Sequence, residues 1–351
     1  MVVSRRSIIG GVDTHTATHH AAVIDSNGRL LADAEFAATP AGYTSMLRWM
    51  RSKGTLIHVG VEGTGAYGAG LARYLHDQGV DVLEVPRPDR RLRRQRGKSD
   101  PIDAEAAART VLAGKASGAP KRADGPIEAI RMLRVARIGA VKARTAAVNT
   151  LRSMVVTAPE SLRAQLRGLS SAQLVAACSR FRPETTNLAD PVQAAKHALR
   201  SIAMRVQHLN IETRTLRKQL DELTRAAAPA TSAIFGLGPD TVAALLVTVG
   251  DNPDRLRSEA AFAHLCGVAP VPASSGKTRR HRLHRGGDRA SNSALHIATV
   301  VRLRYDSRSR AYADRRTTEG LSMPEIIRCQ KRYLAREVFQ ALRADYARIN
   351  T

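Results

Sequence analysis

The order of apolar runs near the amino terminus is the feature that most limits how this chain can fold. Short, β-branched apolar runs predict strands, in chain order, at residues 8–12, 21–24, 30–36, 56–61 and 80–85. Thr39-Pro40 suits the cap and first turn of a helix through Met50, and a second helix is predicted at 66–78. The segment Asp25-Ser26-Asn27-Gly28 is typical of a hairpin turn. The chain therefore predicts a β-β-β-α-β-α-β order, in which a three-strand meander is followed by crossovers.

That order suits an α/β layer of the ribonuclease H-like type, and the rest of the chain is predicted to be mainly helical. An alanine-rich helix at 101–113 and a basic helix at 126–156 follow the layer. From Leu199 to Leu223 the apolar residues are spaced alternately three and four positions apart, and one of these positions holds a polar residue, Thr213. This heptad pattern favours a coiled coil, within or between chains, and a helix packed only on its own domain is the alternative.

The charge of the chain points to a polyanionic partner. Its 351 residues include 55 lysines and arginines against 31 acidic residues, a formal net charge of +24. Nucleic acid is the first candidate, ahead of a membrane surface, and an aromatic content of 4% favours phosphate contacts over base stacking. The apolar fraction of 43% excludes a disordered basic tail. No run reaches the roughly 18 apolar residues of a membrane span, and three scattered cysteines indicate a reducing cytoplasm.

Four carboxylates are candidates for a metal site. Asp13 ends the first predicted strand and Glu62 directly follows another, and open α/β sheets build their sites at such strand ends. Asp100 and Asp103 lie one turn apart at the start of a helix, so they share a face. Four acids converging in a basic chain would repel one another without cations, which suggests a two-magnesium phosphodiester site. The alternative for Asp100 is an ordinary N-cap followed by Pro101, and Asp13 alone could be a turn residue.

Two other patterns near these acids suggest different chemistry. Residues 63–68 read Gly-Thr-Gly-Ala-Tyr-Gly after a strand, and Glu84 follows about twenty residues on, as in a dinucleotide-binding fingerprint. Against this, Glu62 would add negative charge beside a pyrophosphate. The histidines near Asp13 could bind a metal, but a solvated surface is expected for all of them, namely His15, His19 and His20.

Two basic segments are candidates for phosphate contacts. Residues 87–98 hold seven basic side chains in twelve, and a second basic segment, residues 277–289, contains Gly286-Gly287. A solvated linker is the alternative for the first segment, and composition leaves both interpretations open. The basic side chains expected to bind nucleic acid are Arg90, Arg91, Arg93, Arg94, Lys277, Arg279, Arg280 and Arg282.

The carboxyl-terminal third offers a phosphate-binding turn and a candidate nucleophile. Gly236 and Gly238 precede a helix whose free backbone N–H groups could hold a DNA phosphate, as in a helix-hairpin-helix, although an ordinary helix start explains them equally well. Ser274-Ser275-Gly276 lies just before the second basic segment. A serine there could attack a phosphate, because nearby arginines would stabilise the developing charge. Ser-Ser-Gly is also a common turn sequence.

Several motifs, in order over almost the whole chain, resemble those of the insertion sequence IS110 family of transposases. Each motif is weak alone, and together they are quite specific. They are Gly11-Val12-Asp13, Val61-Glu62-Gly63-Thr64-Gly65-Ala66-Tyr67, Lys98-Ser99-Asp100-Pro101-Ile102-Asp103-Ala104, the Gly236-Leu237-Gly238 helix start, and residues 262–270 leading into Ser274-Ser275-Gly276. The family's usual Gly-His or Gly-Asn before a helix of the last domain fits loosely at Gly286-Gly287-Asp288-Arg289 and assigns no role.

The resemblance implies an organisation and a site. It implies a RuvC-like DEDD domain with the basic helix at 1–155, a helical coiled-coil region at 156–228, and a C-terminal transposase domain at 229–351. It implies Mg²⁺ at a two-ion site and a serine that is transiently joined to DNA. Counting from Ala269-Pro270 places Ser275 at the nucleophile position, and a one-residue gap would exchange it for Ser274. The residues implied to be catalytic are Asp13, Glu62, Asp100, Asp103 and Ser275.

The partners and the function follow from the same resemblance. We expect double-stranded DNA (element ends and target), a structured guide RNA encoded by the element, and a homo-oligomer, dimer or tetramer, in the nucleoid of the cytoplasm. The expected function is a Mg²⁺-dependent DNA transposase. One competing candidate is a RuvC-like Holliday-junction nuclease that uses metal-activated water and needs no serine. A non-enzymatic nucleic-acid scaffold and a dinucleotide enzyme are two further candidates.

Overall fold

A computed structural model describes residues 6–86, 99–116, 118–252, 257–274 and 281–349. The chain forms two compact units. Unit 1 comprises residues 1–125 with 249–255, and unit 2 comprises residues 126–248 with 256–351. The later segment of unit 1 is attached to its first part by Asn252, whose side chain donates to the Pro120 carbonyl (2.8 Å) and accepts from the Arg122 backbone N–H (2.9 Å).

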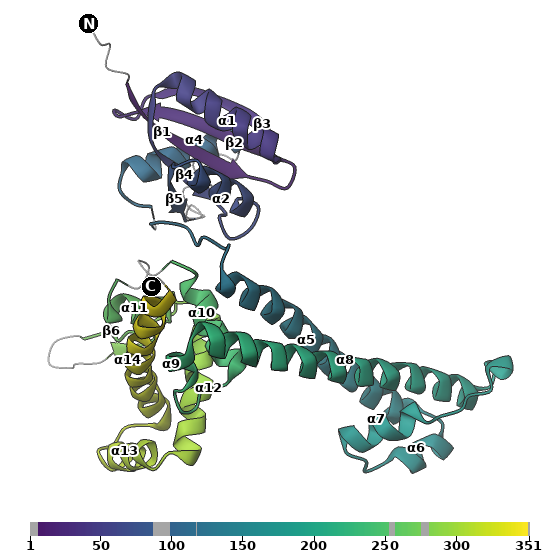
Figure 1. Cartoon of the computed structure of the whole chain (residues 1–351). Helices are drawn as coiled ribbons and strands as arrows, with labels where there is room; N and C mark the ends of the chain where they lie inside the picture. Colours follow the sequence, from purple (N-terminus) through teal and green to yellow (C-terminus); the bar gives the residue numbers. More distant parts are fainter. Residues whose placement is uncertain (1–5, 87–98, 117, 253–256, 275–280, 350–351) are drawn as a thin grey trace, which may run out of the picture. The chain divides into compact units, whose positions relative to one another are not determined.

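Unit 1 contains a five-stranded mixed sheet in the order β3-β2-β1-β4-β5 (Figure 1). The meander of three strands is antiparallel, and β4 and β5 then continue the sheet in parallel from β1. The strands are β1 (Ser7–Thr14), β2 (Thr18–Asp25), β3 (Leu30–Ala37), β4 (Thr55–Glu62) and β5 (Asp81–Val85). All five lie at the positions expected from the apolar runs, which confirms the mixed α/β amino-terminal region.

Helices cover both faces of this sheet. On one face, α1 (Pro40–Lys53) and α2 (Ala69–Asp77) pack on a core that contains Ile8, Val12 and Val61. On the other face, α4 (Asp100–Leu112) packs on Ile9 and its neighbours. Thr39 caps α1, as its side chain accepts the Gly42 N–H (3.2 Å), and Pro40 opens the helix as the sequence indicates.

Two glycines allow α4 to lie directly on the sheet. Gly11 of β1 and Gly60 of β4 are neighbours in the parallel register. A Cβ atom at Gly11 would lie 2.2 Å from the Ala104 carbonyl oxygen, and one at Gly60 would lie 2.6 Å from a Val111 methyl. Alanine-rich α4 therefore approaches the sheet at a distance that any side chain at Gly11 would prevent.

Unit 2 is built around two long helices that lie side by side and run in opposite directions (Figure 1). They are α5 (Pro126–Thr157) and α8 (Pro191–Ala227). The heptad residues fall within α8, and Leu199, Val206 and Leu220 are buried. Three short elements connect the two helices, namely α6 (Glu160–Leu166), α7 (Ser171–Ser179) and the 3-10 turn η1 (Thr185–Asn187). The long helix is confirmed, and the coiled coil stays a prediction.

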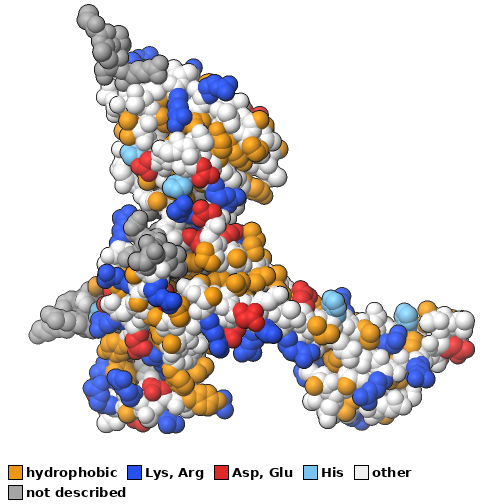
Figure 2. Space-filling view, in the orientation of Figure 1, with side chains coloured by type: hydrophobic (Ala, Val, Ile, Leu, Met, Phe, Trp, Pro, Cys, Tyr) orange, Lys and Arg blue, Asp and Glu red, His pale blue; other side chains and the backbone are white. Residues whose placement is uncertain are grey.

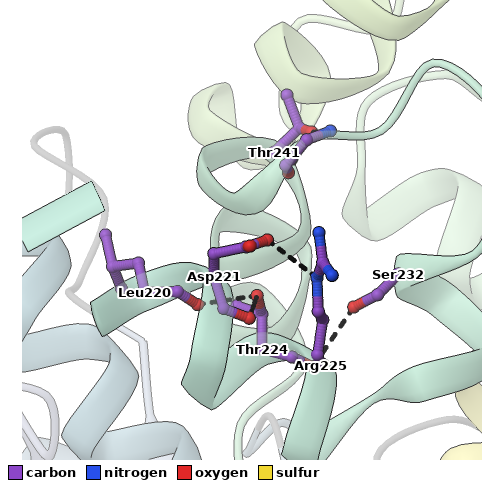
Figure 3. A network of polar contacts seen from close by, with 7 residues as sticks. Leu220, Asp221, Thr224, Arg225, Ser232 and Thr241 are labelled. Carbon is purple, nitrogen blue, oxygen red and sulfur yellow. Dashed lines mark hydrogen bonds and ion pairs between the residues drawn. The ribbon is translucent and has the colours of Figure 1, made fainter. Parts of the chain in front are cut away.

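The remainder of unit 2 is mainly helical, as expected. Its elements are α9 (Pro229–Ser232), α10 (Pro239–Val249), α11 (Glu259–Leu265), β6 (Val271–Pro272), β7 (His281–Arg282), α12 (Arg289–Tyr305), α13 (Ser307–Thr318) and α14 (Met323–Ile349). Figure 3 shows how α8 ends: the Thr224 hydroxyl donates to the Leu220 carbonyl (2.7 Å), and the Ser232 hydroxyl donates to the Thr224 carbonyl (3.2 Å). The three-part division at 155/156 and 228/229 stays a prediction.

Candidate metal centre

The sheet places Asp13 and Glu62 on one face, at the carboxyl ends of two neighbouring parallel strands. Val12 and Val61 are paired in register, and Asp13 and Glu62 follow them. Because side chains alternate along a strand, Asp13 shares the α4 face with Gly11, and Glu62 shares it with Gly60. Asp13 is 8% exposed and Glu62 is 7% exposed. The Thr14 hydroxyl donates to the Glu62 carbonyl (2.9 Å) and thereby ties the two strand ends together.

The first turn of α4 carries the other two acids. Asp103 is 6% exposed, whereas the Asp100 side chain is 43% exposed. The interpretation of Asp100 as the N-cap is wrong: Ser99 takes that position, and its carbonyl accepts the Asp103 N–H (3.0 Å). Asp100 is the first residue of the helix itself. Capping therefore does not explain why an acid stands at position 100.

His15 lies beside the acidic residues, where the sequence analysis had considered metal binding but expected a solvated surface. Its Nε2 lies 3.2 Å from Asp13 Oδ2 and 3.3 Å from Asp100 Oδ1. One ligand atom from each of these three residues lies within 4.8 Å of the others. The Asp-x-His spacing at the end of β1 was the available signal, because a short turn after the strand can bring His15 back beside Asp13.

The other two histidines of this hairpin have different surroundings. His20 Nε2 lies 2.8 Å from Asp33 Oδ1 on the neighbouring strand. His19 is fully buried, and its ring stacks on Tyr43 with a centroid distance of 5.6 Å. Burial lowers the pKa of His19. The expectation of a solvated surface was therefore wrong for His19, since its side chain faces the apolar core on the α1 side.

The glycine-rich segment after β4 folds into a turn that its own residues stabilise. Gly63 has a φ of +71°, which favours glycine, and its carbonyl accepts the N–H groups of Ala66 (2.8 Å) and Gly68 (3.1 Å). The Thr64 hydroxyl donates to Glu84 Oε1 (3.0 Å). Glu84 is the residue that a dinucleotide site would use for the ribose, and here it holds the loop that flanks Glu62.

The remaining candidate residues are partly described. Ser274 follows β6 and Arg282 belongs to β7, and both side chains are exposed. The following candidates lie outside the described residues: Arg90, Arg91, Arg93, Arg94, Ser275, Lys277, Arg279 and Arg280.

The glycine turn before α10 is a compact structure. Gly236 has a φ of +91° and lies against α12, where a Cβ atom would be 3.0 Å from the Ala298 carbonyl oxygen. The Gly238 N–H donates to the Thr241 hydroxyl (2.8 Å). One of the N–H groups expected to bind phosphate thus already has an internal partner.

A basic surface on α13 was not identified from the sequence. Arg308, Arg310 and Arg315 are exposed on this helix, and Figure 2 shows Lys and Arg side chains over the same part of unit 2. Their spacing of two to five residues inside a helix was the available signal. Arg315 forms an exposed pair with Glu319 (3.4 Å).

The acidic group suits a divalent cation. Asp13 and Asp103 are largely buried, and His15 Nε2 lies 3.2 Å from Asp13 Oδ2 and 3.3 Å from Asp100 Oδ1. Like-charged carboxylates in a buried position destabilise one another unless a cation neutralises them. His15 Nε2 is inaccessible to solvent and makes no hydrogen bond of normal geometry with the described residues, as expected of a ligand atom. The donor set therefore fits a divalent metal.

Two models of known protein families match this chain. Residues 10–158, which include all four carboxylates, match a family model described as a transposase, of the DEDD type. The matched region covers most of the first part of unit 1 and continues through α5 of unit 2. Residues 229–314 match a second model, described as the transposase IS116/IS110/IS902 family. The two matches together span about two thirds of the chain, which belongs to the IS110 family of transposases.

A relative from Streptomyces coelicolor is described as "Insertion element IS110 uncharacterized 43.6 kDa protein". It is 34% identical over 124 residues, which make up 34% of this chain and 30% of the relative. The chain is thus matched to less than a third of that protein's length. Within the described residues, no helix is long and apolar enough to cross a membrane.

Proposed function

We propose that the protein is a DNA transposase of an insertion sequence, which cleaves and rejoins DNA through a serine nucleophile at a Mg²⁺-dependent centre. The observation that carries the proposal is the position of Asp13, Glu62 and Asp103. Asp13 and Glu62 are buried at neighbouring strand ends on the face that α4 covers, and Asp103 is buried in the first turn of α4. Family membership supports the same reaction class.

The carboxylates Asp13, Glu62, Asp100 and Asp103 would hold two Mg²⁺ ions. Mg²⁺ bound there supplies positive charge that stabilises the attacking and leaving oxygens of the phosphate. Ser275 provides the attacking hydroxyl: its oxygen bonds to phosphorus, its proton passes to a base, and a deoxyribose oxygen leaves. Attack by a deoxyribose hydroxyl on the phosphoserine then joins the new strand and restores the serine. Ser274 takes this role if the match of this segment to the family pattern contains a one-residue gap.

The other elements serve binding and assembly in this proposal. The arginines of residues 87–98 and of the loop after Ser275 hold the DNA backbone, with Gly236 and Gly238 as a further phosphate contact. The sheet order, with its meander and two parallel crossovers, supports a ribonuclease H-like domain. The coiled coil around α8 serves a homo-oligomer, a dimer or tetramer. A structured guide RNA selects target and donor, and the protein acts on DNA in the cytoplasmic nucleoid.

Removal of one carboxylate tests the enzymatic proposal. We expect Asp13→Asn and Asp103→Asn to lower recombination between element ends and target at least about 100-fold while DNA binding is retained. Asp33→Asn is the matched control, because Asp33 is a strand carboxylate paired with a histidine (His20 Nε2, 2.8 Å). Undiminished recombination by the Asp13 and Asp103 variants would favour the alternative that the protein is a non-enzymatic nucleic-acid scaffold.

A second experiment separates the serine mechanism from a junction nuclease. Denaturing electrophoresis of the protein with labelled DNA should reveal a covalent adduct that disappears in Ser275→Ala and persists in Ser274→Ala. The reverse pattern would assign Ser274. DNA cleavage without an adduct, and without loss in either variant, would show a nuclease that uses water as the nucleophile.

A further inference from the structure

We propose that His15 is a ligand of the metal held by Asp13 and Asp100, so that this position prefers a first-row transition ion such as Mn²⁺ to Mg²⁺. The inference rests on the proposed function, since it concerns the same centre. It adds a nitrogen donor to a set of carboxylates, and thereby changes which divalent ion the centre selects.

The geometry fits three ligands on one side of a single ion. His15 Nε2 is 3.2 Å from Asp13 Oδ2 and 3.3 Å from Asp100 Oδ1. Adjacent donors around an octahedral ion are separated by about 3 Å when each lies about 2.1 Å from the metal. The ligand atoms of the three residues lie within 4.8 Å of one another, so an ion can contact all of them with small adjustments.

The backbone holds His15 in this position. The His15 N–H donates to the Thr18 carbonyl (3.0 Å), which closes the short turn between β1 and β2. The imidazole is thereby returned toward the strand end that carries Asp13. Asp100 approaches from the first turn of α4, whose position is set by the close contact with Gly11. Three different elements thus aim one donor each at a common point.

The unsatisfied nitrogen is the second observation. His15 Nε2 is shielded from solvent, although much of the ring is exposed, and it makes no hydrogen bond of normal geometry with the described residues. Nε2 and the two carboxylate oxygens converge without a hydrogen bond of normal geometry between them. A positive ion among the three atoms would use all three as ligands.

The donor set determines which ions bind well. Mg²⁺ prefers oxygen ligands and retains water, whereas first-row transition ions also accept imidazole, and their affinity for a site of nitrogen and oxygen ligands increases from Mn²⁺ through Co²⁺ to Cu²⁺. Two carboxylates with one imidazole should therefore increase the affinity for Mn²⁺ more than the affinity for Mg²⁺. His20 lies on the same hairpin and is paired with Asp33, so it provides a matched control.

Electron spin-echo spectroscopy of Mn²⁺ bound to the full chain, without nucleic acid, provides a direct test. Wild type and His20→Asn should show ¹⁴N modulation from a coordinated imidazole, and His15→Asn should lose it. In titration calorimetry, His15→Asn should weaken Mn²⁺ binding about tenfold and Mg²⁺ binding less than about twofold. Circular dichroism would verify that each variant is folded.

Each outcome separates this inference from the proposed function. Mn²⁺ binding without ¹⁴N modulation in wild type, or with modulation that persists in His15→Asn, overturns the role of His15 and leaves the carboxylate centre intact. Equal losses of Mn²⁺ and Mg²⁺ affinity also overturn the preference. If wild type binds neither ion, both the inference and the metal-dependent function fail.

Discussion

His19 illustrates how one buried side chain can make stability depend on pH. Its imidazole stacks on Tyr43, and Nδ1 lies 3.0 Å from the Thr18 carbonyl, to which it can donate. Desolvation lowers its pKa below the usual 6.5 in the folded state. The unfolded chain therefore binds a proton more readily, and the contribution of His19 to stability is lost as the pH falls below about 6.5.

We predict that the free energy of unfolding of unit 1 decreases between pH 7 and pH 5, and that His19→Asn makes this decrease smaller. Asparagine retains a donor near Nδ1 and does not titrate. Urea denaturation at pH 7, 6 and 5 would measure both slopes. Equal slopes in wild type and variant would assign the pH dependence to other groups.

Asp345 of α14 is a buried carboxylate that stabilises unit 2. It is 1% exposed and accepts hydrogen bonds from the Ala230 N–H (2.9 Å), the Thr231 N–H (2.9 Å) and the Thr231 hydroxyl (2.7 Å). Removing the acceptor leaves buried donors unsatisfied.

We therefore predict that Asp345→Ala lowers the free energy of unfolding by about 2–4 kcal/mol. Glu222→Ala on α8 is the control, because its ion pair with Lys218 joins side chains that are 64% and 82% exposed and should contribute less than about 1 kcal/mol. Thermal and urea denaturation of both variants would measure the difference. Similar losses in the two variants would contradict a special role for Asp345.

At the scale of elements, the contact between α4 and the sheet determines where two of the acids lie. A matched pair of substitutions on β1 tests this. A Cβ atom at Gly11 would meet α4 backbone atoms at 2.2 and 2.3 Å, whereas one at Gly10 would meet the flexible end of Met50 at 3.0 Å on the opposite face.

We predict that Gly11→Ala lowers the free energy of unfolding by about 1–3 kcal/mol and weakens divalent metal binding, because α4 must move away from Asp13. Gly10→Ala should lower the free energy of unfolding less than Gly11→Ala and leave the affinity for divalent metal unchanged. Urea denaturation and titration calorimetry would measure the two effects. Unchanged metal affinity in Gly11→Ala would show that α4 need not touch the sheet for the centre to form.

The sequence predicts the elements well and the site only in part. Apolar runs identify all five strands of unit 1, and burial on two faces explains such a run in a central strand such as β1. Strand ends and helix starts also identify the four acids. The N-cap was assigned one residue too late, since Ser99 and Asp100 both suit that position. The place of His15 beside Asp100 depends on tertiary contacts between β1, its turn and α4, and local pattern does not encode these contacts.

At the scale of the whole molecule, the net charge of +24 should dominate DNA affinity. If about six phosphates are neutralised, the affinity should fall about 1,000-fold between 50 and 200 mM salt. Arg282→Ala should reduce the slope of log K against log salt by about 1. Arg225→Ala is the control, because its side chain already pairs with Asp221 (3.0 Å). Fluorescence anisotropy at several salt concentrations would measure the slopes, and equal slopes would exclude a phosphate contact by Arg282.

The short segment around Asn252 has a practical consequence for producing unit 1 on its own. A fragment that ends at Gly125 would lack the Asn252 side-chain amide, which is hydrogen-bonded to the Pro120 carbonyl and to the Arg122 N–H. A fragment that retains these hydrogen bonds would need residues 249–252 joined to Gly125 through an artificial linker. A fusion protein that contains only residues 1–125 of unit 1 would lose both hydrogen bonds at Pro120 and Arg122.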